Sequence, residues 1–393
     1  MSLFGKKITA CPFCYNELNM KKVAFRCSQR GQPGRPPCQD TDDPKRRIEF
    51  KDSKPVPPVI TLPGSDPDSS IDLLAAESAV CPSCGGESKI RICPACHSRL
   101  PRSLEAGSPL FGLVGLRFSG KTVLLTVLHK HLKGKVARRF DASIITPGGS
   151  SGLARDLERN EQAMLSGEHL PGQTEQSGGA KQEPAVYEWK GSTKGSGTIF
   201  SFYDNAGEDV KNEDVVTKQK YLAQVSGVML LLDPFAFPEN REVAKSRRVT
   251  VAETDPEAAL DGITSVLQHK RNRKVKTPLA VVVPKIDAFF DQVPANNPIR
   301  RNTPEPDVFD EQDSLDVHDN MVSLIERWGG DNLIRQLRAN YENFRVFGVS
   351  ALGAEPEYGE ARVNSRGLLP HRVADPLLWL LAEHRVIPKS SKK

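Results

Sequence analysis

The sequence has few aromatic residues, no long apolar run and no cysteine after residue 96. Aromatic residues make up 6% of the 393 residues, which is too few to suggest a platform for stacked nucleic-acid bases. No apolar run approaches the roughly 18 residues that span a bilayer. Residues 1–10 also lack the long apolar core of a signal peptide, so we expect a cytoplasmic protein. The net charge of +5 permits contact with nucleic acid without favouring it.

The cysteines are confined to the first quarter of the chain, which indicates a dedicated metal module. Cys81-x2-Cys84 and Cys93-x2-Cys96 are two CxxC pairs eight residues apart, a spacing typical of a zinc ribbon. The other four form a looser set that predicts a second zinc site: Cys11, Cys14, Cys27 and Cys38. Disulfides and redox chemistry are the alternatives, and the lack of a secretion signal disfavours disulfides. We therefore expect about two zinc ions per chain.

The eight residues 115–122 fit the phosphate-loop pattern GxxxxGK[ST]. An apolar run at 110–116 precedes them and a helix-like segment at 123–132 follows, which is the strand–loop–helix context that this loop requires. Loop N–H groups can surround phosphates, the lysine supplies a point charge, and the threonine hydroxyl can ligate Mg²⁺. The residues expected to act in this way are Gly115, Ser119, Gly120, Lys121 and Thr122.

Strand and helix candidates alternate after the phosphate loop. The strand candidates are 140–145, 185–189, 198–203, 227–232, 279–283 and 344–349, and the helix candidates include 153–165, 255–268 and 315–328. Glycine and serine between 185–189 and 198–203 indicate a hairpin. The pattern predicts an α/β domain at 107–393 with a mostly parallel sheet covered by helices on both faces. Before it we expect a first cysteine module at 1–40, a flexible linker at 41–75 and a zinc ribbon at 76–106.

Three further motifs follow the phosphate loop in order. Asp204-Asn-Ala-Gly207 ends a strand candidate, where the aspartate can hold Mg²⁺ through water and the glycine N–H can meet a γ-phosphate. Pro284-Lys-Ile-Asp287 and Ser350-Ala-Leu follow two later strand candidates. The ordered set GLRFSGKT, DNAG, PKID and SAL resembles the translation-factor and Ras-like class of P-loop GTPases. With its cysteine pairs, the chain is also similar to the bacterial double-GTPase group, which is proposed to act in conflict or signalling systems.

The resemblance implies roles for individual residues. Thr122 and Asp204 would hold Mg²⁺, and the Gly207 N–H would contact the γ-phosphate. Thr174 is the candidate for a mobile threonine that closes on Mg²⁺, with Thr193 and Thr198 as alternatives.

The same resemblance assigns the guanine contacts. Asp287 would accept hydrogen bonds from guanine, the Lys285 stem would lie on the base, and Ser350 with Ala351 would frame the guanine carbonyl. Without the resemblance, Asp287 would be interpreted as a helix N-cap and Asp204 as a turn residue.

Four positions depart from the family pattern. Pro284 replaces an asparagine that tethers the base-binding loop to the phosphate loop. Arg117 and Phe118 place bulk near the γ-phosphate, although Arg117 can also stabilise charge in cis. Glu208 replaces the glutamine that orients the attacking water. We expect slow intrinsic hydrolysis that awaits a protein partner or dimerisation.

The sequence is compatible with three functions. The first is a GTPase switch, with GTP, GDP and Mg²⁺ as ligands and zinc modules that recruit a protein partner. The second is a zinc-ribbon adaptor for nucleic acid or protein with a regulatory nucleotide domain, and four ribbon cations keep it open: Lys89, Arg91, Arg99 and Arg102. The third is an ATP-using enzyme, which leaves Asp287 and Ser350 without a purpose.

Overall fold

The structure is a computed structural model in which the chain divides into two compact units. It describes residues 9–50, 54–64, 75–104, 109–116, 118–147, 152–166, 170–171, 183–191, 198–202, 222–252, 255–268, 273–356, 363–364 and 367–390. The cysteine unit comprises Met1–Leu110, Ile145–Ala154 and Ser177–Ser201. The phosphate-loop unit comprises Phe111–Ile144, Arg155–Gln176 and Phe202–Lys393.

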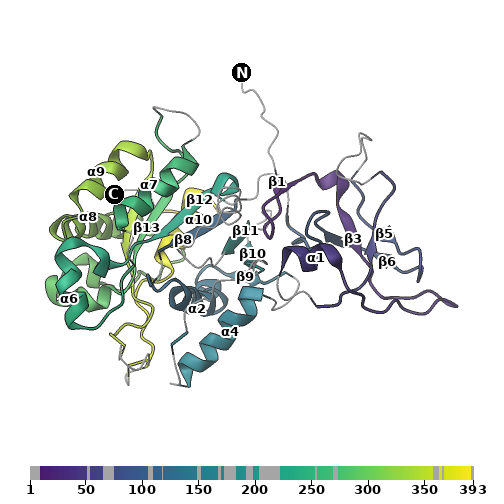
Figure 1. Cartoon of the computed structure of the whole chain (residues 1–393), viewed down its shortest axis with the longest axis horizontal. Helices are drawn as coiled ribbons and strands as arrows, with labels where there is room; N and C mark the ends of the chain where they lie inside the picture. The colour runs from purple at the N-terminus through teal and green to yellow at the C-terminus, as the bar shows by residue number, and fades with distance from the viewer. Residues whose placement is uncertain are drawn as a thin grey trace. The chain divides into compact units, whose positions relative to one another are not determined.

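A parallel sheet forms the centre of the phosphate-loop unit (Figure 1). Among the described residues its strand order is β14-β13-β12-β8, and every neighbouring pair is parallel. All residues of β12 and β13 are buried, as expected for strands covered on both faces. The bounds are β8 Phe111–Gly115, β12 Gly227–Leu231, β13 Leu279–Val283 and β14 Phe344–Gly348. This arrangement confirms the predicted α/β class with a phosphate-loop strand.

Helices cover this sheet, and α7 and α8 begin at side-chain N-caps. Asp255 accepts a hydrogen bond from the Ala258 N–H, and Asp310 accepts one from the Asp313 N–H. Because of the second cap, α8 begins four residues before the predicted start at 315. The α-helices are α2 Lys121–His131, α3 Ala137–Arg139, α4 Gly152–Leu165, α6 Arg241–Ser246, α7 Pro256–Leu267, α8 Glu311–Arg327, α9 Asp331–Asn340 and α10 Asp375–Glu383. Shorter helices are η2 Leu132–Val136, which is a π-helix, and the 3-10 helices η3 Pro234–Ala236, η4 Pro238–Asn240, η5 Ile286–Gln292 and η6 Pro298–Arg300.

Helix α10 is the most deeply buried helix of the set just described. Each of its residues from Asp375 to Ala382 is buried, and the helix contacts β12, β13 and β14. Asp375 receives hydrogen bonds or ion pairs from Thr303 at 2.9 Å and Arg372 at 2.7 Å. The apolar segment 377–381 therefore forms part of the core. None of the helices in the described part of the chain is long and apolar enough to cross a bilayer.

The cysteine unit consists of very short strands around the central strand β3. β3 pairs antiparallel with β4 on one side and with β7 on the other, while β1–β2 and β5–β6 form small antiparallel pairs. The bounds are β1 Thr9–Ala10, β2 Glu17–Leu18, β3 Ala24–Arg26, β4 Val59–Ile60, β5 Ala79–Val80, β6 Glu87–Ser88 and β7 Ile90–Ile92, with η1 at Met20–Lys22. Strands this short bury little apolar surface, and cysteines make up much of the unit's core.

Later segments of the chain complete this core. β10 (Ala185–Gly191) and β11 (Thr198–Phe202) are neighbouring strands of a second sheet, as the predicted hairpin requires. Val186 and Ile199 from these strands belong to the same buried cluster as the cysteines. β9 (Ala142–Ile145) matches the strand predicted at 140–145.

The described part of the expected linker at 41–75 is folded. Helix α1 (Pro44–Glu49) begins at the N-cap Asp43, and β4 extends the sheet through its pairing with β3. A flexible linker was predicted because the segment lacks apolar periodicity, and α1 has no buried residue of its own. A polar contact holds the helix instead, since Arg46 pairs with Glu183 at 3.1 Å. Residues 41–50 and 54–64 therefore belong to the fold of the cysteine unit.

Candidate metal centres and nucleotide site

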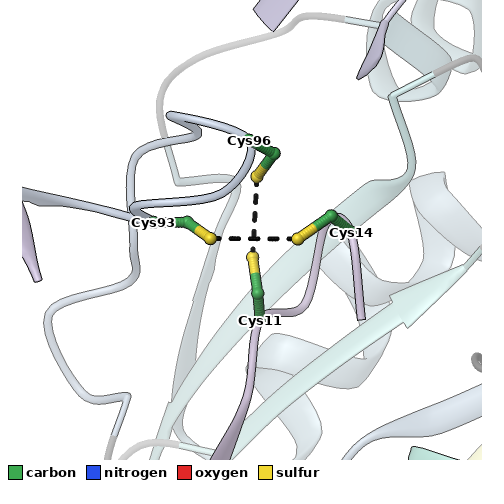
Figure 2. A group of neighbouring side chains, drawn as sticks. All are labelled: Cys11, Cys14, Cys93 and Cys96. Atoms are coloured by element: carbon green, nitrogen blue, oxygen red, sulfur yellow. Dashed lines mark hydrogen bonds between the residues drawn. The ribbon is translucent and has the colours of Figure 1, made fainter. Parts of the chain in front are cut away.

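The eight cysteines form two separate groups of four. Figure 2 shows the first group, in which four sulfur atoms point toward one another: Cys11, Cys14, Cys93 and Cys96. The second group contains Cys27, Cys38, Cys81 and Cys84. Within each group the sulfur atoms all lie within 4.8 Å of one another. The prediction of two four-cysteine sites is confirmed.

The predicted assignment of cysteines to these sites is wrong. Their spacing predicted that Cys81, Cys84, Cys93 and Cys96 share one ion, but the two CxxC pairs belong to different groups. The chain between them does not form one hairpin, since β6 pairs with β5 and β7 pairs with β3 in a different sheet. β7 is antiparallel to β3, with Ala24 opposite Ile92 and Arg26 opposite Ile90. The residues that follow these strands, Cys27 and Cys93, therefore lie at opposite ends of the strand pair.

Three of the four cysteine pairs share one backbone turn. In each CxxC pair, the carbonyl of the first cysteine accepts a hydrogen bond from the residue after the second cysteine. These donors are the N–H groups of Tyr15 at 2.9 Å, Gly85 at 2.8 Å and His97 at 2.9 Å. All three donors have positive φ angles between 54° and 72°. This turn places both sulfur atoms of a pair on the same side, as two ligands of one ion require.

The sulfur–sulfur distances fit a tetrahedral zinc ion. They are 3.8 Å for Cys11–Cys96 and Cys14–Cys93 in the first group. In the second group they are 3.6 Å for Cys27–Cys84 and 3.8 Å for Cys38–Cys81. A tetrahedron with Zn–S bonds of about 2.3 Å has an edge of about 3.8 Å. A disulfide has a sulfur–sulfur distance of about 2.05 Å, so these geometries correspond to a metal site and not to paired disulfides.

Each group combines thiols with different pKa values. Hydrogen bonds from Cys11, Cys14 and Cys96 lower the pKa of Cys93 well below its usual value. Burial raises the pKa of Cys11 and Cys96. In the second group, burial raises the pKa of Cys27 to about 12. For Cys81, burial is outweighed by hydrogen bonds from backbone N–H groups, and its pKa is lowered to about 7.

A buried polar cluster supports the first group. The Arg26 guanidinium donates to Asp43 at 2.8 Å and to the His97 carbonyl at 2.7 Å. His97 Nδ1 lies 2.9 Å from Asp43 Oδ1. Although burial opposes the shift, hydrogen bonds from Arg26 and His97 lower the pKa of Asp43. The cluster fixes the residue that follows Cys96 against the start of α1. Nothing in the sequence spacing pointed to Arg26 or Asp43.

The phosphate-loop segment has the expected strand–loop–helix geometry. Gly115 is the last residue of β8, and a Cβ at this position would lie 2.9 Å from Ser119 Oγ and 3.0 Å from Leu231 Cβ. Gly120 adopts φ +81° as the N-cap of α2, which a residue with a side chain rarely adopts. Lys121 and Thr122 open the helix. Among the described residues, the buried Ser119 hydroxyl has no hydrogen-bond partner.

The segment around Lys285 contacts the phosphate loop directly. Lys285 Nζ donates to the Phe118 carbonyl at 2.8 Å and to Asp233 Oδ2 at 2.7 Å. Asp233 follows β12, is fully buried and also accepts from the Phe235 N–H at 3.1 Å. Pro284 was predicted to remove the tether between these loops, whereas Lys285 connects them. Asp233 was missed as the partner of Lys285, although its position at a strand end was visible in the sequence.

The segments PKID and SAL also meet. The Ile286 N–H donates to the Val349 carbonyl at 3.1 Å, and the Ser350 hydroxyl lies near enough to Asp287 to affect the pKa of its carboxyl group. Burial raises the pKa of Asp287, and the Ser350 hydroxyl opposes this shift. Ala351 lies next to Ser350 and is 9% exposed. The three motifs that follow β8, β13 and β14 are thus linked by contacts within one unit.

Several predicted site residues lie outside the described part of the chain. These are Arg117, Thr174, Thr193, Asp204, Gly207 and Glu208. Thr198, an alternative for the mobile threonine, is a buried residue of β11 in the cysteine unit.

The parallel sheet and the strand–loop–helix segment define an α/β P-loop fold, and two four-cysteine sites accompany it. No protein-family model matches the chain. A Mycolicibacterium smegmatis protein proposed to be the ESX-1 scaffolding and assembly protein SaeC is 25% identical over 324 residues, which cover 76% of this chain and 81% of that protein.

Solved GTPase structures are similar to the chain at a low level. The Arl6 BBS3 small GTPase from Trypanosoma brucei, with bound GppNp, shares 10% identity over 71% of this chain and 98% of its own, with a TM-score of 0.30. The Ski7 GTPase-like domain from S. cerevisiae, bound to GTP, shares 14% identity over 71% of this chain and 50% of its own, with a TM-score of 0.34.

Proposed function

We propose that the chain is a guanine-nucleotide-binding protein and a slow Mg²⁺-dependent GTPase that acts as a nucleotide-controlled switch. The observation that carries this proposal is the contact between three ordered motifs. Lys285 of PKID donates to the phosphate-loop carbonyl of Phe118, and the Ile286 N–H of PKID donates to the Val349 carbonyl directly before SAL. An ATP-using enzyme would have no need for this link between PKID and the loop that follows β14.

The phosphate loop fits a bound nucleoside triphosphate. The buried hydroxyl of Ser119 and the left-handed Gly120 form the type of cradle in which backbone N–H groups surround phosphates. Lys121 would supply positive charge, and Thr122 and Asp204 would hold Mg²⁺. When bound, Mg²⁺ neutralises charge on the β- and γ-phosphates. Gly207 would report the γ-phosphate, and Thr174 would close over the metal.

The base would be recognised by the second part of the site. The Asp287 carboxylate would accept hydrogen bonds from guanine, Lys285 would cover the base with its stem, and Ser350 and Ala351 would frame the carbonyl. Glu208 in place of glutamine, together with Arg117 and Phe118 in the loop, leads us to propose slow turnover without a partner. A second copy of the chain or another protein would then accelerate hydrolysis.

The four-cysteine sites would bind zinc and act as recruitment modules. Tetrahedral sulfur geometry supports zinc at both sites. The similarity to a protein described as a scaffolding and assembly protein agrees with a protein partner.

Titration calorimetry with GTP, GDP and ATP tests the nucleotide assignment. Asp287→Ala removes a charged acceptor, which is worth about 1.5–3 kcal/mol, so GTP affinity should fall about 10- to 100-fold. ATP binding should be weak and unaffected. Asp291→Ala, an exposed residue of the same helix η5, is the matched control and should bind GTP normally. Equal binding of ATP and GTP by the wild type, unchanged in Asp287→Ala, would refute the assignment.

A further inference from the structure

A basic hollow of about 410 Å³ lies on the cysteine unit, apart from the motifs discussed above. Strands β6 and β7 form part of its wall, and the segment after Cys96 forms another part. Its lining consists of Ser28, Arg30, Glu87, Ser88, Lys89, Ile90, Arg91, Arg99, Leu100 and Arg102. We call this feature the basic hollow.

Positive charge dominates the basic hollow. Five of its ten lining residues are cations, and Glu87 is the single acidic residue among them. Arg30, Lys89, Arg99 and Arg102 are exposed, and in the part of the chain that the structure describes none of them forms an ion pair. Clustered like charges repel one another, so their assembly around one hollow favours an anionic ligand.

The walls of the hollow are fixed by hydrogen bonds. Arg91 donates to the Arg102 carbonyl at 2.7 Å, and its own carbonyl accepts from the Leu100 N–H at 2.9 Å. Ser28 donates to the Glu87 carbonyl at 2.9 Å, which joins the loop after Cys27 to β6. The hollow is therefore built on segments that both cysteine groups anchor, and its cations are presented on a preorganised surface.

The chemistry of the lining favours carboxylates over nucleic acid. The lining contains no aromatic residue on which a base could stack. Four of its cations are arginines, whose planar guanidinium groups pair with carboxylates through two parallel hydrogen bonds. The volume is in the range of pockets that enclose a small molecule or a few side chains. We propose that the basic hollow binds an acidic segment of a partner protein through its Asp and Glu side chains.

Fluorescence anisotropy on the full, zinc-loaded chain tests this site. The probe is a labelled peptide in which Glu alternates with Ser, and labelled oligo-dT is the competing probe. Arg99→Ser/Arg102→Ser removes two cations from the hollow, and peptide affinity should fall about tenfold because each exposed ion pair contributes about a threefold change in affinity. Arg35→Ser/Lys54→Ser is the matched control, since it removes two exposed charges from the same unit outside the hollow. Its affinity should stay within about twofold of the wild type.

The outcomes separate the alternatives. Loss of peptide binding in the first variant and not in the control supports the proposal. An equal loss in both variants shows a net-charge effect and overturns it, as does unchanged binding in both. Tighter binding of oligo-dT than of the peptide, lost in the first variant, also overturns it and assigns the hollow to nucleic acid. If Arg99→Ser/Arg102→Ser loses zinc, Lys89→Ser/Arg99→Ser replaces it. Peptide binding is measured without nucleotide, so its result is independent of the proposed GTPase.

Discussion

Paired cysteine substitutions distinguish the observed grouping of the cysteines from the predicted one. In the observed grouping, which we call nested, the four cysteines of the second group lie in the sequence between the two CxxC pairs of the first group. In the predicted grouping, Cys81, Cys84, Cys93 and Cys96 share one ion. Cys81→Ser/Cys93→Ser removes one sulfur from each observed group, whereas Cys11→Ser/Cys93→Ser removes two sulfurs from the same group. Both variants lose two thiolates, so they are matched in chemistry. They differ only in how the losses are distributed between the sites.

The expected effect is large because metal binding supplies much of the stability of such a unit. Structural zinc in small domains contributes on the order of 10 kcal/mol at neutral pH, and a whole domain is stable by only about 5–15 kcal/mol. A site with three thiolates binds zinc weakly, and a site with two no longer forms a closed tetrahedron. Cys81→Ser/Cys93→Ser should therefore weaken both sites, and its cysteine unit should unfold. Cys11→Ser/Cys93→Ser should keep the ion held by Cys27, Cys38, Cys81 and Cys84.

Zinc-to-protein ratios after gel filtration measure the difference. The wild type should carry about two ions, Cys11→Ser/Cys93→Ser about one, and Cys81→Ser/Cys93→Ser fewer than one. Limited proteolysis of the first 110 residues provides an independent readout of unfolding. If Cys81→Ser/Cys93→Ser retains one tightly held ion while Cys11→Ser/Cys93→Ser retains none, the nested arrangement is incorrect.

Two further predictions concern the phosphate-loop unit. Lys285→Met leaves the fully buried Asp233 without its cation and should lower the free energy of unfolding in urea by about 3 kcal/mol. The double variant Asp233→Asn/Lys285→Met should recover part of that loss. A double variant whose destabilisation equals the sum of the two single variants would contradict the buried ion pair. Burial lowers the pKa of His129, His131 and His318 to about 4, below the value near 6.5 in an unfolded chain. The unfolded state thus binds more protons between these values, so stability should fall as the pH is lowered from 6.5 toward 4, and His318→Gln should reduce that slope.

Most strands of the phosphate-loop unit could be predicted because the apolar residues that they bury are consecutive in the sequence. β12 and β13 are continuous apolar runs, and such runs indicate strands covered on both faces. Helix α9 was not predicted, since it lacks a side-chain N-cap and directly follows α8 after a short turn at Gly329 and Gly330. The strands β1 to β7 of the cysteine unit are two or three residues long, which is too short for a period to be detected.

The grouping of the cysteines could not be predicted because it depends on strand pairing between distant segments. Spacing alone defines which cysteines can share one turn, as the three CxxC pairs do. Whether Cys84 and Cys93 then face the same ion depends on the direction of β7 relative to β3. That direction is set by packing of β3 between two partners, which a local motif does not contain.

The contact between Lys285 and Phe118 links two segments in which the sequence departs from the pattern of the GTPases that it resembles, at Pro284 and at Phe118. Phe118 and Lys285 both have left-handed backbones, with φ angles of 62° and 57°. Such conformations cost about 1–2 kcal/mol for residues with side chains. Both strained residues are joined by one hydrogen bond of 2.8 Å, and Lys285 is held in turn by the buried carboxylate of Asp233. The proposed base-binding loop and the phosphate loop therefore share an anchor after β12, so a movement of either loop must disturb the other. The proposed nucleotide-controlled switch requires coupling of this kind, and the contact supplies it without the asparagine that the resemblance to GTPases leads one to expect in place of Pro284.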